Sequence, residues 1–202
     1  MEPEVPSMGT YDWVAEALLS PEGSTFTAFD IETTGLDPKI HRIVEIGAVK
    51  FDRRGVIGRF STLINPGLPM NPEASAVNGI TDEQLADKPP VERVLPDFLR
   101  FVGSSILVAH NANFDCSFIN ATLKTCYSDG GLLWQAPFPA LPNKIVDTLS
   151  FAKEAFPGRP NYKLQNLAAF LDLDSKNAHR AEDDARLCME LLLQCVRHTQ
   201  EK

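Results

Sequence analysis

Residues 25–36 read TFTAFDIETTGL, and the architecture of the chain can be worked out from this stretch. Its first part, Thr25 to Ile31, is apolar or β-branched at most positions, which is typical of a buried strand. Asp30 and Glu32 stand two positions apart at the end of that strand, so their side chains are expected on the same face. The turn formers from Thr34 to Pro38 predict that the chain reverses direction directly after the two acids.

Strand and helix patterns alternate through the rest of the chain. Further strands are expected at 43–52, 56–64, 105–109 and 144–147, the first two forming an antiparallel hairpin. Helices are expected at 82–86, 91–102, 114–123, from 148 through 155, at 164–171 and at 182–196. The rest of 66–90 is expected to be turns, and 128–143 a Gly- and Pro-rich excursion. This order predicts an α/β protein with a mixed central sheet of about five strands flanked by helices.

The composition is that of a soluble globular protein. The chain has 202 residues, of which 44% are hydrophobic and 23% charged, enough for one domain with a sizeable core. No apolar run approaches the roughly 18 residues of a membrane span, and the N-terminus lacks the features of a secretory signal. We therefore expect a cytoplasmic protein without membrane contact. Residues 1–23 are expected to be an N-terminal extension with a short helix over 11–19, and residues 24–202 the main domain.

The net charge and the cysteines exclude some classes of protein. A net charge of −8 argues against a protein that coats nucleic acid by bulk electrostatics. It does not exclude a nucleic-acid enzyme, since an acidic site attracts phosphate once divalent cations fill it. The four cysteines form no CxxC pair, which argues against a zinc knuckle, and they are expected as buried thiols.

Asp115 is a third candidate acid. It follows the apolar strand expected at 105–109 through the tetrapeptide His110-Asn111-Ala112-Asn113. The pattern places it in the first turn of the next helix, where an acid also suits the helix dipole. If the strand at 105–109 lies beside the strand at 25–31, Asp115 lies next to Asp30. Taken alone, Asp30 and Glu32 would more often be solvated carboxylates, and Asp115 would more often be a carboxylate that only marks the start of a helix.

His179 and Asp184 complete the set, in the stretch HRAEDD. Five residues apart on one helix, they would point about 140° apart. They can converge only if His179 lies in the loop before the helix and Asp184 in its first turns. The acids at 182–184 indicate a helix start there. Alone, His179 would be an exposed loop histidine, but the order of all five residues favours one site.

These motifs together resemble the DEDD superfamily of 3′→5′ exonucleases, in its histidine-containing, DnaQ-like group. That group includes the proofreading epsilon subunit of bacterial DNA polymerase III. The motifs that carry the resemblance are FDIETTGL at 29–36, HNANFD at 110–115 and HRAEDD at 179–184. The weaker matches are RIVEIGA at 42–48, NPG at 65–67 and VNGIT at 77–81. The sister group with a tyrosine is excluded, because the residue four before Asp184 is Arg180.

The resemblance implies a ribonuclease H-like fold, with residues 24–202 as an exonuclease domain that uses two Mg²⁺ or Mn²⁺ ions. Asp30, Glu32 and Asp184 would hold the first ion. Asp30 would bridge to the second, with Asp115 acting partly through water. His179 would be the general base for the water that attacks the terminal phosphodiester, which suits a residue that titrates near neutral pH. Oxygen ligands suit such hard ions, and two of them together stabilise the attacking and leaving oxygens.

The resemblance also suggests substrate contacts. Thr33, Thr34 and Leu36 would sit under the terminal nucleotide, while Glu73 and Asn78 would approach it. The related group often has histidine at the position of Asn78, and Glu73 could equally be a surface turn acid.

Three basic residues on loops near the expected site, Arg159, Lys163 and Arg180, are candidate phosphate contacts, with solvated charges as the alternative. Tyr162 is expected to be a packing residue where the chain enters a helix.

The favoured substrate is single-stranded DNA with a 3′-OH end, because Thr33-Thr34 resembles the epsilon motif. The alternatives are an exoribonuclease that trims RNA ends, a catalytically idle nucleic-acid-binding module and an unrelated metal hydrolase. A DNA polymerase is a conceivable partner. However, the chain ends six residues after Val196 and shows no C-terminal tether, which favours either an enzyme that acts alone or one that its partner holds by another surface.

Overall fold

The computed structural model describes residues 11–21, 23–128, 140–175 and 180–201. The strands are β1 (Phe26–Thr33), β2 (Ile43–Asp52), β3 (Gly55–Leu63), β4 (Ile106–Ala109) and β5 (Ile145–Asp147). The helices are α1 (Asp12–Leu19), α2 (Pro72–Asn78), α3 (Asp82–Leu85), α4 (Val91–Val102), α5 (Asn113–Ser128), α6 (Thr148–Ala155), α7 (Leu164–Phe170) and α8 (Ala181–Gln200).

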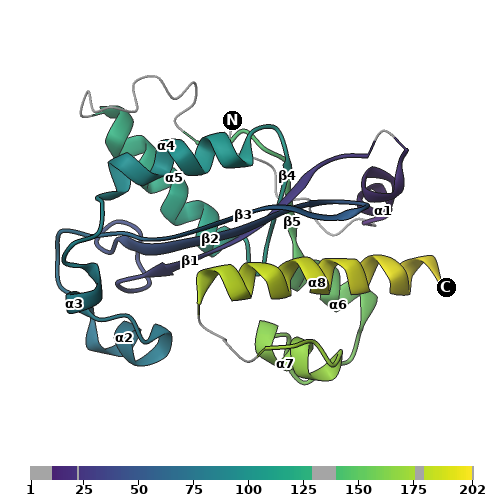
Figure 1. The fold of residues 1–202 in the computed structure, drawn as a ribbon. Helices are drawn as coiled ribbons and strands as arrows, with labels where there is room; N and C mark the ends of the chain where they lie inside the picture. The colour runs from purple at the N-terminus through teal and green to yellow at the C-terminus, as the bar shows by residue number, and fades with distance from the viewer. Residues whose placement is uncertain (1–10, 22, 129–139, 176–179, 202) are drawn as a thin grey trace.

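The strands form one mixed sheet in the order β3-β2-β1-β4-β5 (Figure 1). β1 pairs antiparallel with β2, and β2 pairs antiparallel with β3. β4 runs parallel to β1 and to β5. The α/β class and the mixed sheet of five strands are therefore confirmed, and β4 does lie beside β1 as the placement of Asp115 required.

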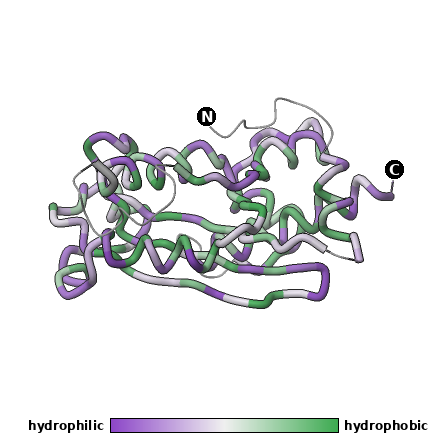
Figure 2. Tube along the Cα trace, turned by 90° about the horizontal axis from the view of Figure 1, so that it is seen from above, coloured by the Kyte–Doolittle hydropathy of each residue, from purple (hydrophilic) through white to green (hydrophobic). Residues whose placement is uncertain are grey.

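Helices cover both faces of the sheet, and each face has its own hydrophobic core (Figure 1). On one face, Phe26 and Ala28 of β1 pack with residues of α1, α6, α7 and α8. On the other face, Phe29 and Ile31 pack with α4 and α5. The alternation follows from the two-residue period of a strand. Figure 2 shows how hydrophobic and hydrophilic residues alternate along the chain.

The helix α2 was not expected, because its sequence is rich in turn formers. Asn71 caps its start and accepts a hydrogen bond from the backbone N–H of Glu73 at 2.9 Å, and Pro72 occupies the first turn. Gly79 ends it with a φ of 69°, a left-handed conformation that favours glycine. The residues that suggested turns are therefore the caps of a short helix. Two expected helices are longer than predicted, because α5 runs to Ser128 and α8 to Gln200.

The helix expected at 11–19 is confirmed as α1, and it packs on the α8 face of the sheet. Tyr11 stacks on Phe151 of α6 with ring centroids 4.3 Å apart, and Val14 and Leu18 are buried. The division of the chain into an extension over 1–23 and a domain over 24–202 stays a prediction. Among the described residues, no helix is long and apolar enough to cross a membrane.

Candidate active site

Three carboxylates converge where the end of β1 meets the start of α8. Asp30 and Glu32 project from the same face of β1 as Phe26 and Ala28, toward α8, and Asp184 lies in the first turns of α8. One carboxylate oxygen from each of these acids lies within 4.8 Å of those of the other two. Residues far apart in the sequence thus form one acidic cluster, in the arrangement expected from the motifs.

A glycine on β2 lets α8 approach the sheet closely enough to deliver Asp184. Gly47 pairs directly with Asp30 in the β1–β2 register. A Cβ at position 47 would lie 2.0 Å from the backbone nitrogen of Glu182 and 2.1 Å from the carbonyl carbon of Ala181. The start of α8 therefore rests on the backbone of β2, and no other residue fits at position 47 without displacing the helix.

Asp115 is buried beside this cluster, in the first turn of α5. Its Oδ1 accepts a hydrogen bond from the backbone N–H of Ile31 at 3.2 Å. The pairing of β1 with β4 ends at Ala28 and Val108, so the N–H of Ile31 lies beyond the ladder. The carboxylate of Asp115 takes the place that a further strand residue would occupy.

The loop before α5 is held by Asp147 at the end of β5. The Oδ1 of Asp147 accepts hydrogen bonds from the backbone N–H groups of Asn111, at 2.9 Å, and Ala112, at 3.3 Å. Asn111 has a φ of 62°, and His110 bonds through Nε2 to the carbonyl of Tyr162 at 2.8 Å. This loop fixes the start of α5 and, with it, the position of Asp115.

His179, expected as the general base, lies outside the described residues, so its role stays a prediction. The helix that follows, α8, begins at Ala181, so Asp184 lies in its first turns as expected. Arg180 is the N-cap residue of α8. The backbone N–H of Asp184 donates a hydrogen bond to the carbonyl of Arg180 at 3.0 Å.

Burial, together with the nearby negative charges, raises the pKa values of these acids. Burial raises the pKa of Asp30 well above its usual range, and the charges of Asp115, Glu32 and Asp184 raise it further. Burial also raises the pKa of Glu32 to about 8, against a hydrogen bond from Asn78 that lowers it. The pKa of Asp115 rises to about 8, again chiefly because of burial.

Divalent cations relieve this repulsion. Carboxylate oxygens are the ligands that hard divalent cations prefer, and a cation among them would return these groups to the charged form. The donor set therefore fits a divalent metal site.

The predicted substrate contacts differ in their exposure. The hydroxyl of Thr33 donates to the carbonyl of Gly35 at 2.6 Å, and the Oγ1 of Thr34 accepts from the backbone N–H of Arg42 at 3.0 Å. Both threonines are buried, so their hydroxyls serve the turn after β1. Leu36, in contrast, is 82% exposed.

The other two predicted contacts both lie on α2. Asn78 is buried and hydrogen-bonds the carboxylate of Glu32, while its Oδ1 accepts from the backbone N–H of Ile80 at 3.0 Å. Glu73 is exposed in the first turn of the helix. The unexpected helix α2 therefore brings Asn78 to the edge of the acidic cluster.

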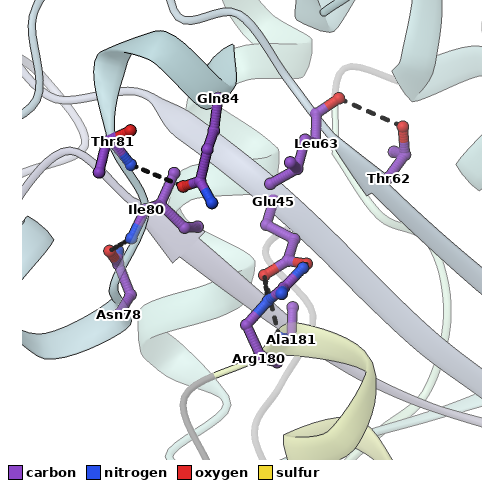
Figure 3. A network of polar contacts seen from close by, with 9 residues as sticks. All are labelled: Glu45, Thr62, Leu63, Asn78, Ile80, Thr81, Gln84, Arg180 and Ala181. Carbon is purple, nitrogen blue, oxygen red and sulfur yellow. Dashed lines mark hydrogen bonds and ion pairs between the residues drawn. The ribbon is translucent and has the colours of Figure 1, made fainter.

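A salt bridge between a buried glutamate and a half-exposed arginine lies beside the cluster and was not predicted from the sequence (Figure 3). Glu45 has a side chain only 2% exposed, and Arg180 donates to its Oε1 at 2.8 Å. The backbone N–H of Ala181 donates to Oε2 of Glu45 at 3.2 Å. Arg180 was a candidate phosphate contact, but its guanidinium is paired with Glu45. The one signal in the sequence was a charged residue inside the otherwise apolar strand IVEIGAV.

Gln165 on α7 is a second residue at the site that was not predicted from the sequence. Its Nε2 donates to Oδ1 of Asp184 at 2.8 Å. Its Oε1 is buried and has no hydrogen-bond partner within the part of the chain that the structure describes. No local pattern distinguishes this glutamine from a surface residue of a helix, because the contact depends on how α7 packs against α8.

The remaining basic candidates lie around α7. Arg159 stacks on the ring of Phe170, and Lys163 is the N-cap residue of α7. The hydroxyl of Tyr162 donates to the carbonyl of Phe156 at 2.8 Å, and the residue packs against the core on the α8 face. Its expected packing role is confirmed. Contacts of Arg159 and Lys163 with phosphate stay predictions.

Sequence comparisons place the chain among exonucleases. The sequence profile of the RNase_T exonuclease family matches residues 27–192. The DNA polymerase III subunit epsilon of Treponema pallidum (strain Nichols) is 48% identical over 190 residues, which cover 93% of this chain and 82% of that protein. The DNA polymerase III PolC-type of Thermotoga petrophila is 41% identical over 87% of this chain, which spans only 12% of that much longer protein.

Solved structures agree with this placement. Exonuclease X in complex with 5′ overhanging duplex DNA superimposes with a TM-score of 0.66 at 28% identity, covering 88% of this chain and 93% of that chain. Exonuclease I of E. coli in complex with a dT13 oligonucleotide gives a TM-score of 0.70 at 21% identity, covering 88% of this chain and 42% of that chain. The ribonuclease H-like fold is thereby confirmed.

Proposed function

We propose that this chain, which belongs to the RNase_T exonuclease family and is a 3′→5′ exonuclease, acts on single-stranded DNA and releases nucleoside 5′-monophosphates. The observation that carries the proposal is the convergence of Asp30, Glu32 and Asp184 within 4.8 Å, with Asp115 buried beside them. A module that only bound nucleic acid would have no use for four crowded carboxylates, which destabilise the fold unless cations neutralise them.

The four carboxylates divide into ligands of two kinds in this proposal. Asp30, Glu32 and Asp184 would hold one divalent ion, and Asp30 and Asp115 would help to hold the second. When bound, two Mg²⁺ or Mn²⁺ ions supply the positive charge that stabilises the attacking and leaving oxygens of a phosphodiester. Asn78 keeps the carboxylate of Glu32 oriented through its hydrogen bond, and Gln165 does the same for Asp184.

His179 acts as the general base in this proposal. Its imidazole takes the proton from the water that attacks the terminal phosphorus, because an imidazole accepts protons near neutral pH. The 3′ oxygen of the preceding nucleotide leaves, so the products are a nucleoside 5′-monophosphate and a strand shorter by one. The exposed side chain of Leu36 lies in the turn directly after the cluster, where it can contact the terminal nucleotide.

DNA is the favoured substrate because of the relatives. The epsilon subunit of DNA polymerase III is named for DNA synthesis, and the two exonuclease structures were solved with DNA. Proofreading or repair of DNA is thus the proposed setting, either beside a polymerase or alone. All four cysteines are buried thiols, which fits the proposed setting in the reducing cytoplasm.

A side-by-side digestion tests the substrate and the reaction. Matched 3′-OH single-stranded DNA, duplex DNA and RNA are incubated with the protein and Mg²⁺, and the products are resolved by length. We expect single-stranded DNA to shorten one nucleotide at a time from its 3′ end, with release of mononucleotides. EDTA should abolish the shortening. Faster digestion of RNA than of DNA would overturn the choice of substrate, and no digestion of any strand would overturn the activity itself.

A further inference from the structure

The N-terminal helix α1 lies outside the region that the family profile matches, yet it packs against elements that lead to the active site. The profile begins at residue 27, whereas α1 covers Asp12–Leu19. Val14 and Leu18 are buried in the same hydrophobic core as Val146 of β5. The helix therefore belongs to the folded body of the protein and shares a core with β5.

The strand β5 is short and depends on support from outside the sheet. It has three residues and lies at the edge of the sheet, next to β4. A strand of this length at an edge is held weakly by its backbone hydrogen bonds. Just before the strand, Lys144 Nζ lies 4.6 Å from the centre of the Trp13 ring. Just after it, Phe151 stacks on Tyr11 with ring centroids 4.3 Å apart. The helix α1 thus supports β5 on both sides of the strand.

Asp147, the last residue of β5, lies at the same edge of the sheet as the acidic cluster. The strand β4 runs parallel to β1 and to β5, so the carboxyl ends of all three strands meet there. Asp147 accepts hydrogen bonds from the backbone N–H groups of Asn111 and Ala112 through Oδ1, and from the hydroxyl of Ser150, at 3.0 Å, through Oδ2. The φ of 62° at Asn111 is one that residues other than glycine rarely adopt unless their surroundings hold them. Asp147 therefore sets the conformation of the loop that leads to Asp115.

The hydroxyl of Tyr11 reaches Asp147 through Ser150. The side chain of Tyr11, the N-cap residue of α1, is buried and hydrogen-bonds that of Ser150. Because Ser150 gives its single hydroxyl proton to Asp147, Tyr11 is the donor in this contact. Burial, and then the charge of Asp147, raise the pKa of Tyr11, which keeps its hydroxyl protonated. A chain of two hydrogen bonds therefore connects the start of α1 with Asp147.

We propose that Tyr11 is a positioning residue for the reaction. Through Ser150 and Asp147, its hydroxyl fixes the loop that presents Asp115 to the second divalent ion. The proposal rests on the proposed function, which gives Asp115 a part in holding that ion. Residues that orient a metal ligand without touching the metal change the affinity for the metal about 10- to 100-fold. Tyr11 acts from one contact further away, so its effect is expected to be smaller, about threefold.

The test removes single hydroxyl groups and measures the affinity for metal. Tyr11→Phe keeps the stack on Phe151 and loses only the donor, and Ser150→Ala removes the next link. The control Thr27→Val removes a buried hydroxyl that lies 2.7 Å from Ser105 Oγ, in a different hydrogen bond. The affinity of the metal-free protein for Mn²⁺ is measured by calorimetric titration. The kcat and KM for oligo-dT are measured at a temperature well below the Tm of every variant.

In both single variants, the weaker of the two Mn²⁺ affinities should fall about threefold, and kcat at subsaturating metal should fall by a similar factor. Saturating metal should restore kcat, and KM for oligo-dT should stay within about twofold of wild type. A double variant with Tyr11→Phe and Ser150→Ala should lose no more affinity than the weaker single variant, because both changes break one chain of hydrogen bonds. Thr27→Val should lower Tm and leave the Mn²⁺ affinities unchanged.

Unchanged Mn²⁺ affinities in both single variants would overturn the proposal. An equal loss of affinity in Thr27→Val would also overturn it, because the loss would then reflect stability in general. Additive losses in the double variant would show that Tyr11 and Ser150 act independently, which contradicts the proposed chain. If wild type binds two Mn²⁺ ions but does not shorten DNA, the proposed function fails, and the Mn²⁺ affinities alone then decide the role of Tyr11.

Discussion

Glu32 and Glu45 face each other on β1 and β2 as direct partners in the sheet, yet their surroundings are opposite. The carboxylate of Glu45 accepts hydrogen bonds from Arg180 and from the backbone N–H of Ala181. Glu32 and Asp30 form no ion pair within the described ranges, and the charged groups that raise their pKa values are other acids. Glu45 is paired with a cationic side chain of the protein itself, whereas the negative charge of Glu32 would be balanced by a bound cation.

This contrast separates a structural carboxylate from a functional one. Arg180 neutralises Glu45 permanently, and the pair fastens the start of α8 to β2, beside His179 in the sequence. At Glu32, burial and then the negative charge of Asp184 raise the pKa to about 8. The protein tolerates that cost where a metal relieves it. The same strand pair therefore combines an ion pair that fixes α8 with acids whose charges only bound cations would balance.

The largest difference between the two regions is expected in activity. Asp30→Asn removes the charge at the centre of the cluster and should lower kcat on single-stranded DNA by about 10³-fold or more, since a bound metal contributes several kcal/mol to the transition state. Glu45→Gln should keep most of the activity under conditions where the variant is folded. Release of thymidine 5′-monophosphate from oligo-dT with Mg²⁺ measures both. A comparable loss of activity in both variants would contradict the distinction between a functional and a structural carboxylate.

The second difference is in stability, and it has the opposite order. Glu45→Gln leaves the guanidinium of Arg180 beside a neutral partner and should lower the free energy of unfolding by about 2 kcal/mol, below the usual cost for a fully buried pair because Arg180 is half exposed. Asp30→Asn should make the metal-free protein more stable, since it removes repulsion. Urea unfolding in EDTA measures both. The control Arg54→Ala, at an exposed ion pair, should stay close to wild type.

A smaller effect is expected at Gln165, which touches the cluster without being charged. Gln165→Leu keeps the volume but loses the hydrogen bond to Asp184, and should weaken the binding of Mn²⁺ about tenfold. Calorimetric titration of the metal-free protein measures this affinity. The control Gln194→Leu makes the same replacement near the C-terminal end of α8, away from the cluster, and should not change the affinity for Mn²⁺. An equal loss in both variants would mean that Gln165 acts only through helix stability.

The smallest effect is on the pH dependence of the metal-free protein. The pKa of Asp115 is about 8 in the folded protein against 3.8 as its ordinary value, so the folded state holds a proton that the unfolded state loses. This contribution to stability is fully present below about pH 4 and is lost as the pH rises through 8. In EDTA, Tm should therefore fall by about 5 °C between pH 5.5 and pH 8.5.

Two further measurements isolate this effect. Asp115→Asn, which keeps an acceptor for the N–H of Ile31, should flatten the fall in Tm, whereas Asp183→Asn should not. Excess Mg²⁺ at pH 8.5 should restore the Tm of wild type. A Tm that rises with pH in EDTA would contradict the raised pKa of these acids.

The sheet and most of the acidic cluster were predictable because their signals are local. Asp30 and Glu32 lie two apart on an apolar strand, and the acids around Asp184 mark a helix start. Their convergence depended on one assumption, that the strand before Asp115 lies beside β1, and the register confirms it.

The supporting residues were not predictable, because their partners are distant in the sequence. Glu45 and Arg180 are 135 positions apart, and nothing in the stretch around Arg180 distinguishes an ion pair from a phosphate contact. Asn78 was placed only by resemblance, and the helix that carries it was hidden by capping residues that resemble turn residues. Gln165 meets Asp184 only after α7 packs on α8.

The short length of β4 has a consequence for how such sites can change. The strand stops at Ala109, which leaves the N–H of Ile31 for the carboxylate of Asp115. Two more strand residues would advance the chain by about 6.6 Å, extend the ladder to Ile31 and carry α5 past Asp30. An insertion of two residues here would preserve the fold and remove a ligand. A change in the length of the link between β4 and α5 could therefore leave a related protein with the same fold but without the carboxylate of Asp115 at the site.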